Sequence, residues 1–319
     1  MNNPLNETRF EEHIAECLAQ GDLYNQRLSS QFDIDRLCDV EMLERFLRAQ
    51  TKTWMQLAHA FPGQEVNTVI TEYNKKLNRG ESILTMLLKG LTIKGIKVKL
   101  VQFKPVLDGP ESVPYKLYRE NCFSVVRQMH YSTANTTYGS KKENLAELDL
   151  CILVNGIPLL TCELKNEGTG QNYGHGIYQY RYERNPENRM LRNCLVHFVM
   201  DNNFVFMTTK LDGENTRFLP FNRESVNPPI DGEYATAYMW RPVEGEPESN
   251  ILGADSLLDI IENFFKRVND EKNKPVVFFP RFHQLRAVRK LRRMVKEDGP
   301  GHNYLIQHSA GSGKTKSMA

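Results

Sequence analysis

The sequence predicts an α/β fold, on three observations. Apolar residues recur at helical spacing in several segments of the first 90 residues. After Gly95 the period changes to the alternation expected of strands, and short β-rich runs follow one another. The dipeptide Asn155-Gly156 stands between two apolar runs, which is a strong signal for a β-hairpin.

The helices of the N-terminal part are predicted from apolar spacing and from breakers. Thr8 is the expected N-cap of the first helix, with Glu11 as its capping-box partner, and Gly21 ends that helix. The expected helices are 10–18, 40–61 (as one long helix or two short ones), 66–77 and 83–88.

The rest of the chain is predicted as strands with two later helices. Asn202-Asn203 is the expected turn of a second hairpin, and 131–144 is expected to be a long mobile loop. The expected strands are 96–103, 122–131, 147–155, 158–166, 195–201 and 204–211; helices are expected at 176–183 and 254–268, and irregular structure at 227–250.

Composition sets broad limits. A length of 319 residues suggests about two domains. The net charge of +2 is too close to neutral to indicate nucleic-acid binding by itself, so any basic surface has to be local. Six scattered cysteines without a C-x-x-C pair predict buried reduced thiols and a cytoplasmic protein, and no apolar run is long enough for a membrane span.

Asp149, Glu163 and Lys165 form a candidate catalytic site. Asp149 precedes the Asn155-Gly156 turn and the other two follow it, so a hairpin pairing position i with about 311 − i brings Glu163 near Leu148 and beside Asp149. Two carboxylates in apolar strands would repel each other unless a cation lay between them, and Mg²⁺ suits such oxygen ligands. The alternative is that all three are polar groups on a solvated face, and the spacing alone leaves both interpretations open.

A second phosphate signal, HSAGSGKT, follows the short apolar segment Tyr304–Gln307. Backbone N–H groups around Gly311 and Gly313 would cradle phosphates, Lys314 would reach the β- and γ-phosphates, and Thr315 would bind Mg²⁺. His308 stands where the general pattern has glycine. Because the motif comes so near Ala319, we expect the chain to be an N-terminal piece of a longer polypeptide.

The block ELDLCILVNGIPLLTCELKNEG resembles the PD-(D/E)xK nuclease core of the restriction (R) subunits of type I restriction-modification enzymes. RFEEHI, HFVMDNNFVFMTTKL, FLPFN and FFPRFHQLRAV extend the resemblance in the same order. It implies a nuclease core with a mixed sheet flanked by helices, followed by the start of a RecA-like P-loop helicase domain. The implied domains are 1–268 (nuclease, with a helical insertion at about 40–90), 269–275 (linker) and 276–319 (motor).

The resemblance also implies roles for individual residues. Asp149 and Glu163 would be metal ligands and Lys165 the catalytic lysine. The family's early helix acid matches Glu11, a further ligand or neighbour of the metal, with Glu12 as its competitor. In the helix after the lysine, the implied catalytic residues are Gln179 and its tyrosine partner, for which Tyr182 is the first choice. Further along the chain, Gln284 would bind an adenine, supported by Arg281.

The function implied is Mg²⁺-dependent cleavage of double-stranded DNA, coupled in the full-length protein to ATP-driven translocation. The expected cofactors are Mg²⁺ and ATP, and the expected partners are DNA and the modification and specificity subunits. The chain lacks a DExx box, so we expect this piece alone to hydrolyse no ATP. The alternative is a superfamily two helicase or remodelling ATPase whose nuclease-like domain only docks partners.

Overall fold

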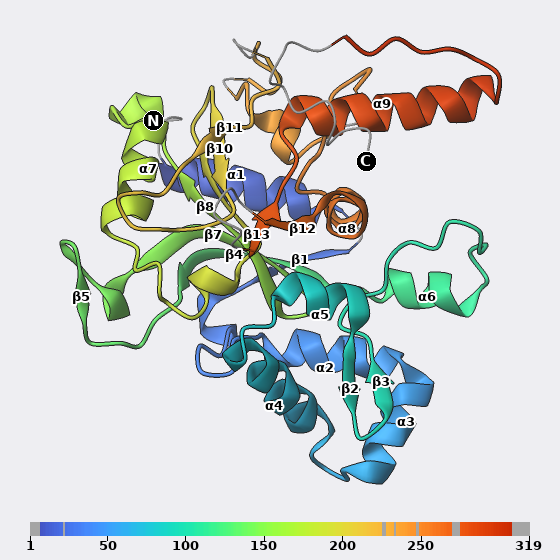
Figure 1. Ribbon diagram of the computed structural model, residues 1–319. Helices are drawn as coiled ribbons and strands as arrows, with labels where there is room; N and C mark the ends of the chain where they lie inside the picture. Colours follow the sequence, from blue (N-terminus) through green and yellow to red (C-terminus); the bar gives the residue numbers. More distant parts are fainter. Residues whose placement is uncertain are drawn as a thin grey trace.

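The computed structural model describes residues 7–21, 23–224, 228–232, 234–246, 249–269 and 275–307. A mixed seven-stranded sheet lies at its centre (Figure 1), in the order β1-β4-β7-β8-β9-β10-β11. The pairs β1–β4 and β8–β9 are parallel, and the other neighbours in this sheet are antiparallel. The strands are β1 Tyr24–Arg27, β4 Phe123–His130, β7 Glu147–Val154, β8 Ile157–Leu164, β9 Val196–Met200, β10 Val205–Thr208 and β11 Leu219–Pro220.

Helices flank this sheet, and four of them form a separate group that we call the helical lobe, residues 40–98. In Figure 1 the lobe lies below the sheet, and α9 lies on the opposite side. The lobe contains α2 Val40–Ala49, α3 Thr51–Ala60, α4 Glu65–Asn78, α5 Ile83–Lys89 and the hairpin of β2 Leu91–Ile93 with β3 Ile96–Val98. The other helices are α1 Glu7–Ala19, α6 Val113–Arg119, α7 Tyr173–Tyr182, α8 Ala254–Asp259 and α9 Phe282–Asp298.

The β7–β8 hairpin has the turn that the sequence predicts. Asn155 and Gly156 have φ values of 48° and 78°, the positive values that a two-residue type I′ turn requires. A β-carbon on Gly156 would lie 2.1 Å from the carbonyl oxygen of Asp39, so no larger residue fits against α2. Asn155 donates from Nδ2 to the Leu100 carbonyl at 2.9 Å, which ties the turn to the segment that follows the helical lobe.

The two central strands are buried on both faces. Every residue of β8 is buried, including Glu163, and the apolar residues of β7 are buried as well. Near-continuous apolar runs are typical of strands with covered faces, which explains why ELDLCILV and IPLLTCEL lack strict alternation. A polar side chain on these strands is therefore held away from bulk water.

The mixed α/β architecture with helices on the sheet confirms the predicted fold class. The expected start of a RecA-like unit around the phosphate loop, 308–319, lies outside the described residues. The segment 40–61 forms two helices that meet at Gln50. The Asn202-Asn203 hairpin is confirmed by the antiparallel pairing of β9 with β10.

Four local predictions are wrong. Thr8 lies inside α1 and is not its N-cap. Of the strand expected at 96–103 only Ile96–Val98 forms, because it pairs with the short β2 alone. The helix expected at 254–268 passes from α8 into a π-helical turn, η6 Ile260–Phe264, and β12 Lys266–Asn269 follows it, paired with β13 Pro275–Phe278. The expected loop 131–144 contains the small hairpin of β5 Thr137–Tyr138 and β6 Lys141–Lys142.

The domain boundary at 269–275 stays a prediction, although strands on either side of 270–274 pair with each other. All six cysteines are free thiols, five of them buried. Across the described part of the chain, no helix combines the length and apolar character needed to cross a membrane.

Candidate active site

A shift of register in the β7–β8 hairpin brings the two carboxylates face to face. Near the turn Leu153 pairs with Pro158, as a constant sum of 311 requires, but beyond a bulge Leu150 pairs with Cys162. Continuing that register places Asp149 opposite Glu163, so the prediction that Glu163 lies nearest Leu148 is wrong by one residue. Pro158 has no N–H to donate to the ladder, and prolines within sheets favour such bulges.

The row of residues that contains this pair continues into β4. Arg127 pairs with Leu150 and Met129 with Leu148, so Gln128 stands beside Asp149. Gln128 has a φ of +47°, which is uncommon for a residue with a side chain and interrupts the ladder at this point. The carboxylate row thus lies where the regular sheet is distorted on both sides of β7.

Asp149 is held by the end of β8. Its Oδ2 accepts a hydrogen bond from the Leu164 N–H at 2.6 Å and lies 3.5 Å from Lys165 Nζ. Lys165 Nζ also donates to the Leu164 carbonyl at 2.7 Å, and its N–H donates to the Met200 carbonyl on β9 at 2.9 Å. The lysine is only 3% exposed at its side chain, so its position is fixed by the sheet.

Glu163 is fully buried and has an arginine as its partner. Arg184 Nε and Nη2 lie 2.8 and 2.7 Å from Glu163 Oε1, and both side chains are almost completely removed from solvent. Glu163 Oε2 is buried and accepts no hydrogen bond from any described residue. Burial raises the pKa of Glu163 to about 8; Arg184 and Lys165 act against this rise, and Asp149 adds to it.

Four ionisable side chains therefore share this site, two acids and two bases. The sequence alone led us to expect that the carboxylates need an external cation, but Lys165 and Arg184 supply two positive charges from the protein itself. Arg184 was missed because nothing in its local sequence marks it. The available signal was indirect: a glutamate inside an apolar strand requires a buried cation, and Arg184 follows α7 at two residues' distance.

The helix α7 lies directly over Glu163. A β-carbon on Gly176 would lie 2.6 Å from Val199 Cγ1 and 3.5 Å from Glu163 Cβ, so the glycine permits the close approach of α7 to β8 and β9. Gln179 Oε1 is buried without a hydrogen-bond partner among the described residues. Tyr182 is 41% exposed and packs against Tyr178, with ring centroids 4.8 Å apart, so the structure does not bring it to the carboxylates.

The tyrosine that α7 points inward is Tyr180. Its hydroxyl lies 2.6 Å from Thr161 Oγ1, which is 2.7 Å from His197 Nδ1. This buried chain joins α7 to β8 and β9 beside the carboxylate row. The resemblance leads one to expect a tyrosine four residues after Gln179, where Glu183 stands, so the neighbouring Tyr182 was preferred and Tyr180 was passed over.

Glu11 is connected to the row through Gln128. Its Oε1 accepts from Gln128 Nε2 at 2.6 Å, and its Oε2 lies 3.7 Å from Arg127 Nε. Glu12, the competing residue, is half exposed and accepts from Arg127 Nη2 at 3.1 Å. Within the described residues, no three His, Cys, Asp or Glu side chains are gathered closely enough to hold a metal ion. Glu11 as a ligand therefore stays a prediction that this geometry does not support.

Asp149 and Glu163 nevertheless fit a divalent cation. The observation is Glu163 Oε2, a carboxylate oxygen that is buried with no donor to satisfy it. An unsatisfied buried acceptor costs free energy, and a hard cation is a partner of the right chemistry for it. The Leu164 peptide group, which contacts both Asp149 and Lys165, lies in the same place.

Only some of the residues that were expected to belong to a motor lie in the described part of the chain. Gln284 is buried, and its Oε1 accepts from the Arg281 N–H at 2.9 Å, which closes the first turn of α9. Its expected role at an adenine stays a prediction. Gly311, Gly313, Lys314 and Thr315 lie outside the described residues. On α9, Arg286 pairs with Glu246, and Arg289 and Arg292 pair with Asp259, which favours a structural role for this basic face.

His197 makes the fold sensitive to acid. Burial lowers its pKa to about 3, so in the native state it stays neutral while the unfolded chain binds a proton near pH 6.5. The neutral imidazole's contribution to the free energy of unfolding is fully present above pH 6.5. As the pH falls toward 3, up to roughly 4 kcal/mol of this free energy is lost. We expect the free energy of unfolding in urea to fall over this window, and to fall less in His197→Asn. An equal fall in both proteins would contradict this assignment.

The chain matches a known protein family. A family model described as the type I restriction enzyme R protein N terminus matches residues 18–217. The match covers Asp149, Glu163, Lys165, Gln179 and Tyr182, and it begins after Glu11. A search of curated proteins found no match.

Proposed function

Because the chain belongs to the family of type I restriction enzyme R protein N termini, we propose that it cuts double-stranded DNA at the Asp149–Glu163–Lys165 group. The observation that carries the proposal is the pairing of two carboxylates next to a buried lysine, with one oxygen of Glu163 left without a donor. This arrangement supports a metal-dependent phosphodiesterase over a structural ion pair alone.

In the proposed reaction each side chain has one task. Asp149 and Glu163 Oε2 would hold Mg²⁺, which when bound lowers the pKa of a water and stabilises charge developing on the phosphate. Lys165 places a positive charge beside Asp149, where the scissile phosphate would lie, and its burial keeps that charge from being screened. Arg184 holds Glu163 in position through Oε1 and leaves Oε2 for the cation.

We further propose that the intact subunit couples this cleavage to ATP-driven translocation and works with modification and specificity subunits. The phosphate-loop sequence GSGKT supports the first point and family membership supports the second. No described residue reads a DNA sequence in this proposal, so target recognition is assigned to the partners.

Incubation of the assembled complex with circular DNA, ATP and Mg²⁺ tests the proposal. The expected products are linear DNA and inorganic phosphate, measured in the same reaction. If phosphate is released at the usual rate and the DNA stays intact circles, the nuclease proposal is wrong. The alternative, a motor with a nuclease-like docking domain, would then be favoured.

A further inference from the structure

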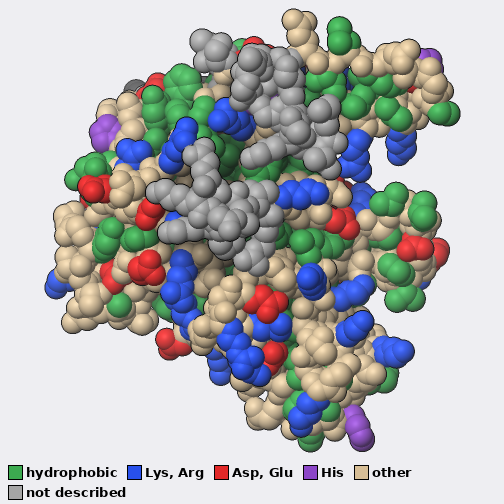
Figure 2. Space-filling model, viewed as in Figure 1, with side chains coloured by type: hydrophobic (Ala, Val, Ile, Leu, Met, Phe, Trp, Pro, Cys, Tyr) green, Lys and Arg blue, Asp and Glu red, His purple; other side chains and the backbone are tan. Residues whose placement is uncertain are grey.

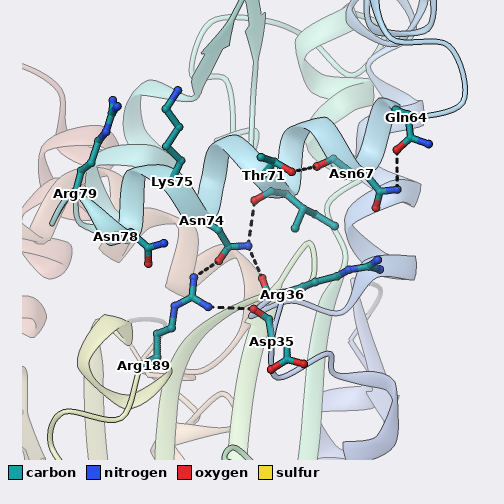
Figure 3. A pocket seen from close by; sticks show the side chains of 11 residues that line it. Asp35, Arg36, Gln64, Asn67, Thr71, Asn74, Lys75, Asn78, Arg79 and Arg189 are labelled. Atoms are coloured by element: carbon teal, nitrogen blue, oxygen red, sulfur yellow. Dashed lines mark hydrogen bonds between the residues drawn. The ribbon is translucent and has the colours of Figure 1, made fainter.

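A polar pocket of about 730 Å³ opens on the helical lobe, away from the carboxylate row (Figure 3). It lies between α4, the segment Asp35–Arg36 and Arg189, which precedes the short helix η4 Leu191–Asn193. Figure 2 shows many more Lys and Arg than Asp and Glu side chains on the lower part of the face in view, where the lobe lies. The lining carries four basic side chains, Arg36, Lys75, Arg79 and Arg189, against the single acid Asp35.

One face of α4 consists of neutral hydrogen-bonding groups. Asn67, Thr71, Asn74 and Asn78 follow one another at spacings of four, three and four, so they share one side of the helix. The side of α4 turned to the core buries Val69, Ile70, Tyr73 and Leu77. Solvated helix faces are usually rich in charged residues of both signs, whereas this stripe carries amides and a hydroxyl.

Arg189 is fixed in place by neutral acceptors. Its Nη2 donates to Asn74 Oδ1 at 2.6 Å and its Nη1 donates to the Asp35 carbonyl at 3.0 Å. Asn74 in turn donates from Nδ2 to the Arg36 carbonyl at 3.0 Å. Figure 3 shows Arg189 pointing toward Asn74, with Asp35 and Arg36 beside it. The guanidinium is therefore oriented by neutral groups, and no carboxylate of a described residue forms an ion pair with it.

The other cations are only weakly neutralised. Lys75 pairs with Glu72 at 3.1 Å and Arg36 with Asp33 at 3.5 Å, and the basic partner of each pair is about half exposed. Exposed pairs of this kind are worth little and exchange readily for another anion. Within the part of the chain that the structure describes, no ion pair holds Arg79.

We propose that this pocket binds the phosphate backbone of double-stranded DNA. The inference rests on the proposed function, since it gives the same DNA a second contact. Arg, Lys, Asn, Gln and Thr side chains are those that contact phosphates without reading sequence. A protein partner would need an apolar centre. Ile70, the one apolar residue among those that line the pocket, is buried in the core, so no exposed apolar side chain stands at the centre of the pocket.

The pocket lies within reach of DNA held at the carboxylate row. Arg184, which pairs with Glu163, and Arg189, which lines the pocket, are joined by five peptide units. Five residues span at most roughly 18 Å, about half of one turn of B-form DNA. A duplex engaged at the site can therefore extend to the pocket.

The test measures binding without cleavage. The intact subunit is titrated with a fluorescent duplex of about 30 base pairs, roughly three helical turns, without ATP or Mg²⁺. The salt concentration is varied from roughly 50 to 200 mM. For the triple variant Arg36→Gln/Lys75→Gln/Arg79→Gln we expect affinity about tenfold weaker at low salt. We also expect the slope of log affinity against log salt concentration to become shallower by about two to three, which is close to 0.9 for each phosphate that is no longer neutralised.

A matched control removes the same charge elsewhere. Lys210, Lys266 and Lys290 are exposed and lie outside the helical lobe, and their triple replacement by glutamine should leave affinity and salt dependence within about twofold of wild type. Asn78→Asp adds one negative charge at an exposed, isosteric position and should weaken binding without disturbing the buried contacts of Arg189. Its thermal unfolding should match that of wild type.

Several results would overturn the proposal. One is a pocket variant that binds the duplex like wild type, and another is a control variant that loses as much affinity. If the pocket variant binds DNA normally but loses stabilisation by inorganic phosphate, the ligand is a free phosphate compound. If it binds DNA normally but no longer assembles with partner subunits, the pocket is a protein interface. If circular DNA stays uncut in the cleavage experiment, the nuclease proposal is wrong, but the measured binding of duplex DNA at the pocket is unaffected.

Discussion

Replacing Lys165 with alanine in the intact subunit is expected to lower the rate of DNA cleavage by at least about a hundredfold, with ATP consumption unchanged. Removal of one oriented positive or hydrogen-bonding group from a water-excluded site commonly costs a factor of this size. Lys165 has both properties, since its side chain is 3% exposed and Nζ is fixed by the Leu164 carbonyl and by Asp149. Cleavage of circular DNA and phosphate release, followed together, separate the two activities.

Two further variants make this result specific. Lys210→Ala removes an exposed lysine from the loop after β10 and should cut at the wild-type rate. Lys165→Arg keeps the charge but needs room for a planar group in a closed space, so we expect it to stay impaired. Cleavage by Lys165→Ala within a few-fold of wild type would show that Lys165 has no part in the reaction.

The carboxylate site could be predicted from sequence to within one residue because a single turn sets its register. Asn155-Gly156 specifies a two-residue turn, and the turn fixes which positions of β7 and β8 face each other. The error came from Pro158, whose missing N–H favours the bulge between Ile152 and Leu153. Proline inside a predicted strand was therefore a visible sign of a register shift, and the shift brought the acids closer together.

Other parts of the site depend on contacts that sequence spacing does not determine. Arg184 meets Glu163 because α7 lies close over β8, and that closeness depends on Gly176. Neither the path of a helix over a sheet nor the choice between Tyr180 and Tyr182 follows from local periodicity. The same is true of Arg189, which reaches Asn74 on α4, more than 100 positions earlier in the chain. These are tertiary contacts between segments joined by long connections.

The ion pair of Arg184 with Glu163 suggests why a fully buried carboxylate is tolerated in the core of the sheet. Arg184 donates from Nε to Oε1, its Nη2 forms an ion pair with the same oxygen at 2.7 Å, and Nη2 donates to the Glu147 carbonyl at 2.6 Å, so the arginine is bound to both β7 and β8. A well-packed apolar pair would be at least as stable in such a position. The cost of retaining the charges is consistent with a functional role for Oε2 of Glu163.

Replacing Arg184 with alanine is accordingly expected to destabilise the chain by about 3 to 5 kcal/mol, because it leaves Glu163 as an unpaired buried acid. The pKa of Glu163, already raised by burial to about 8, should rise further. When the pKa of a group is higher in the folded than in the unfolded protein, the stability that the group contributes is fully present below the unfolded-state pKa. This stability is lost as the pH rises through the folded-state pKa. The deficit of Arg184→Ala relative to wild type should therefore grow above pH 8, as measured by urea unfolding of the 319-residue chain.

The double variant Glu163→Gln/Arg184→Met distinguishes loss of the charge pair from loss of packing. It removes both charges and keeps similar volume, so its stability should return to within about 1 kcal/mol of wild type, with little change between pH 6 and pH 9. DNA cleavage should nevertheless stay lost, because the carboxylate oxygens of Glu163 are gone. A double variant as unstable as Arg184→Ala would mean that Arg184 acts through packing alone. A double variant that still cuts DNA would remove Glu163 from the proposed metal site.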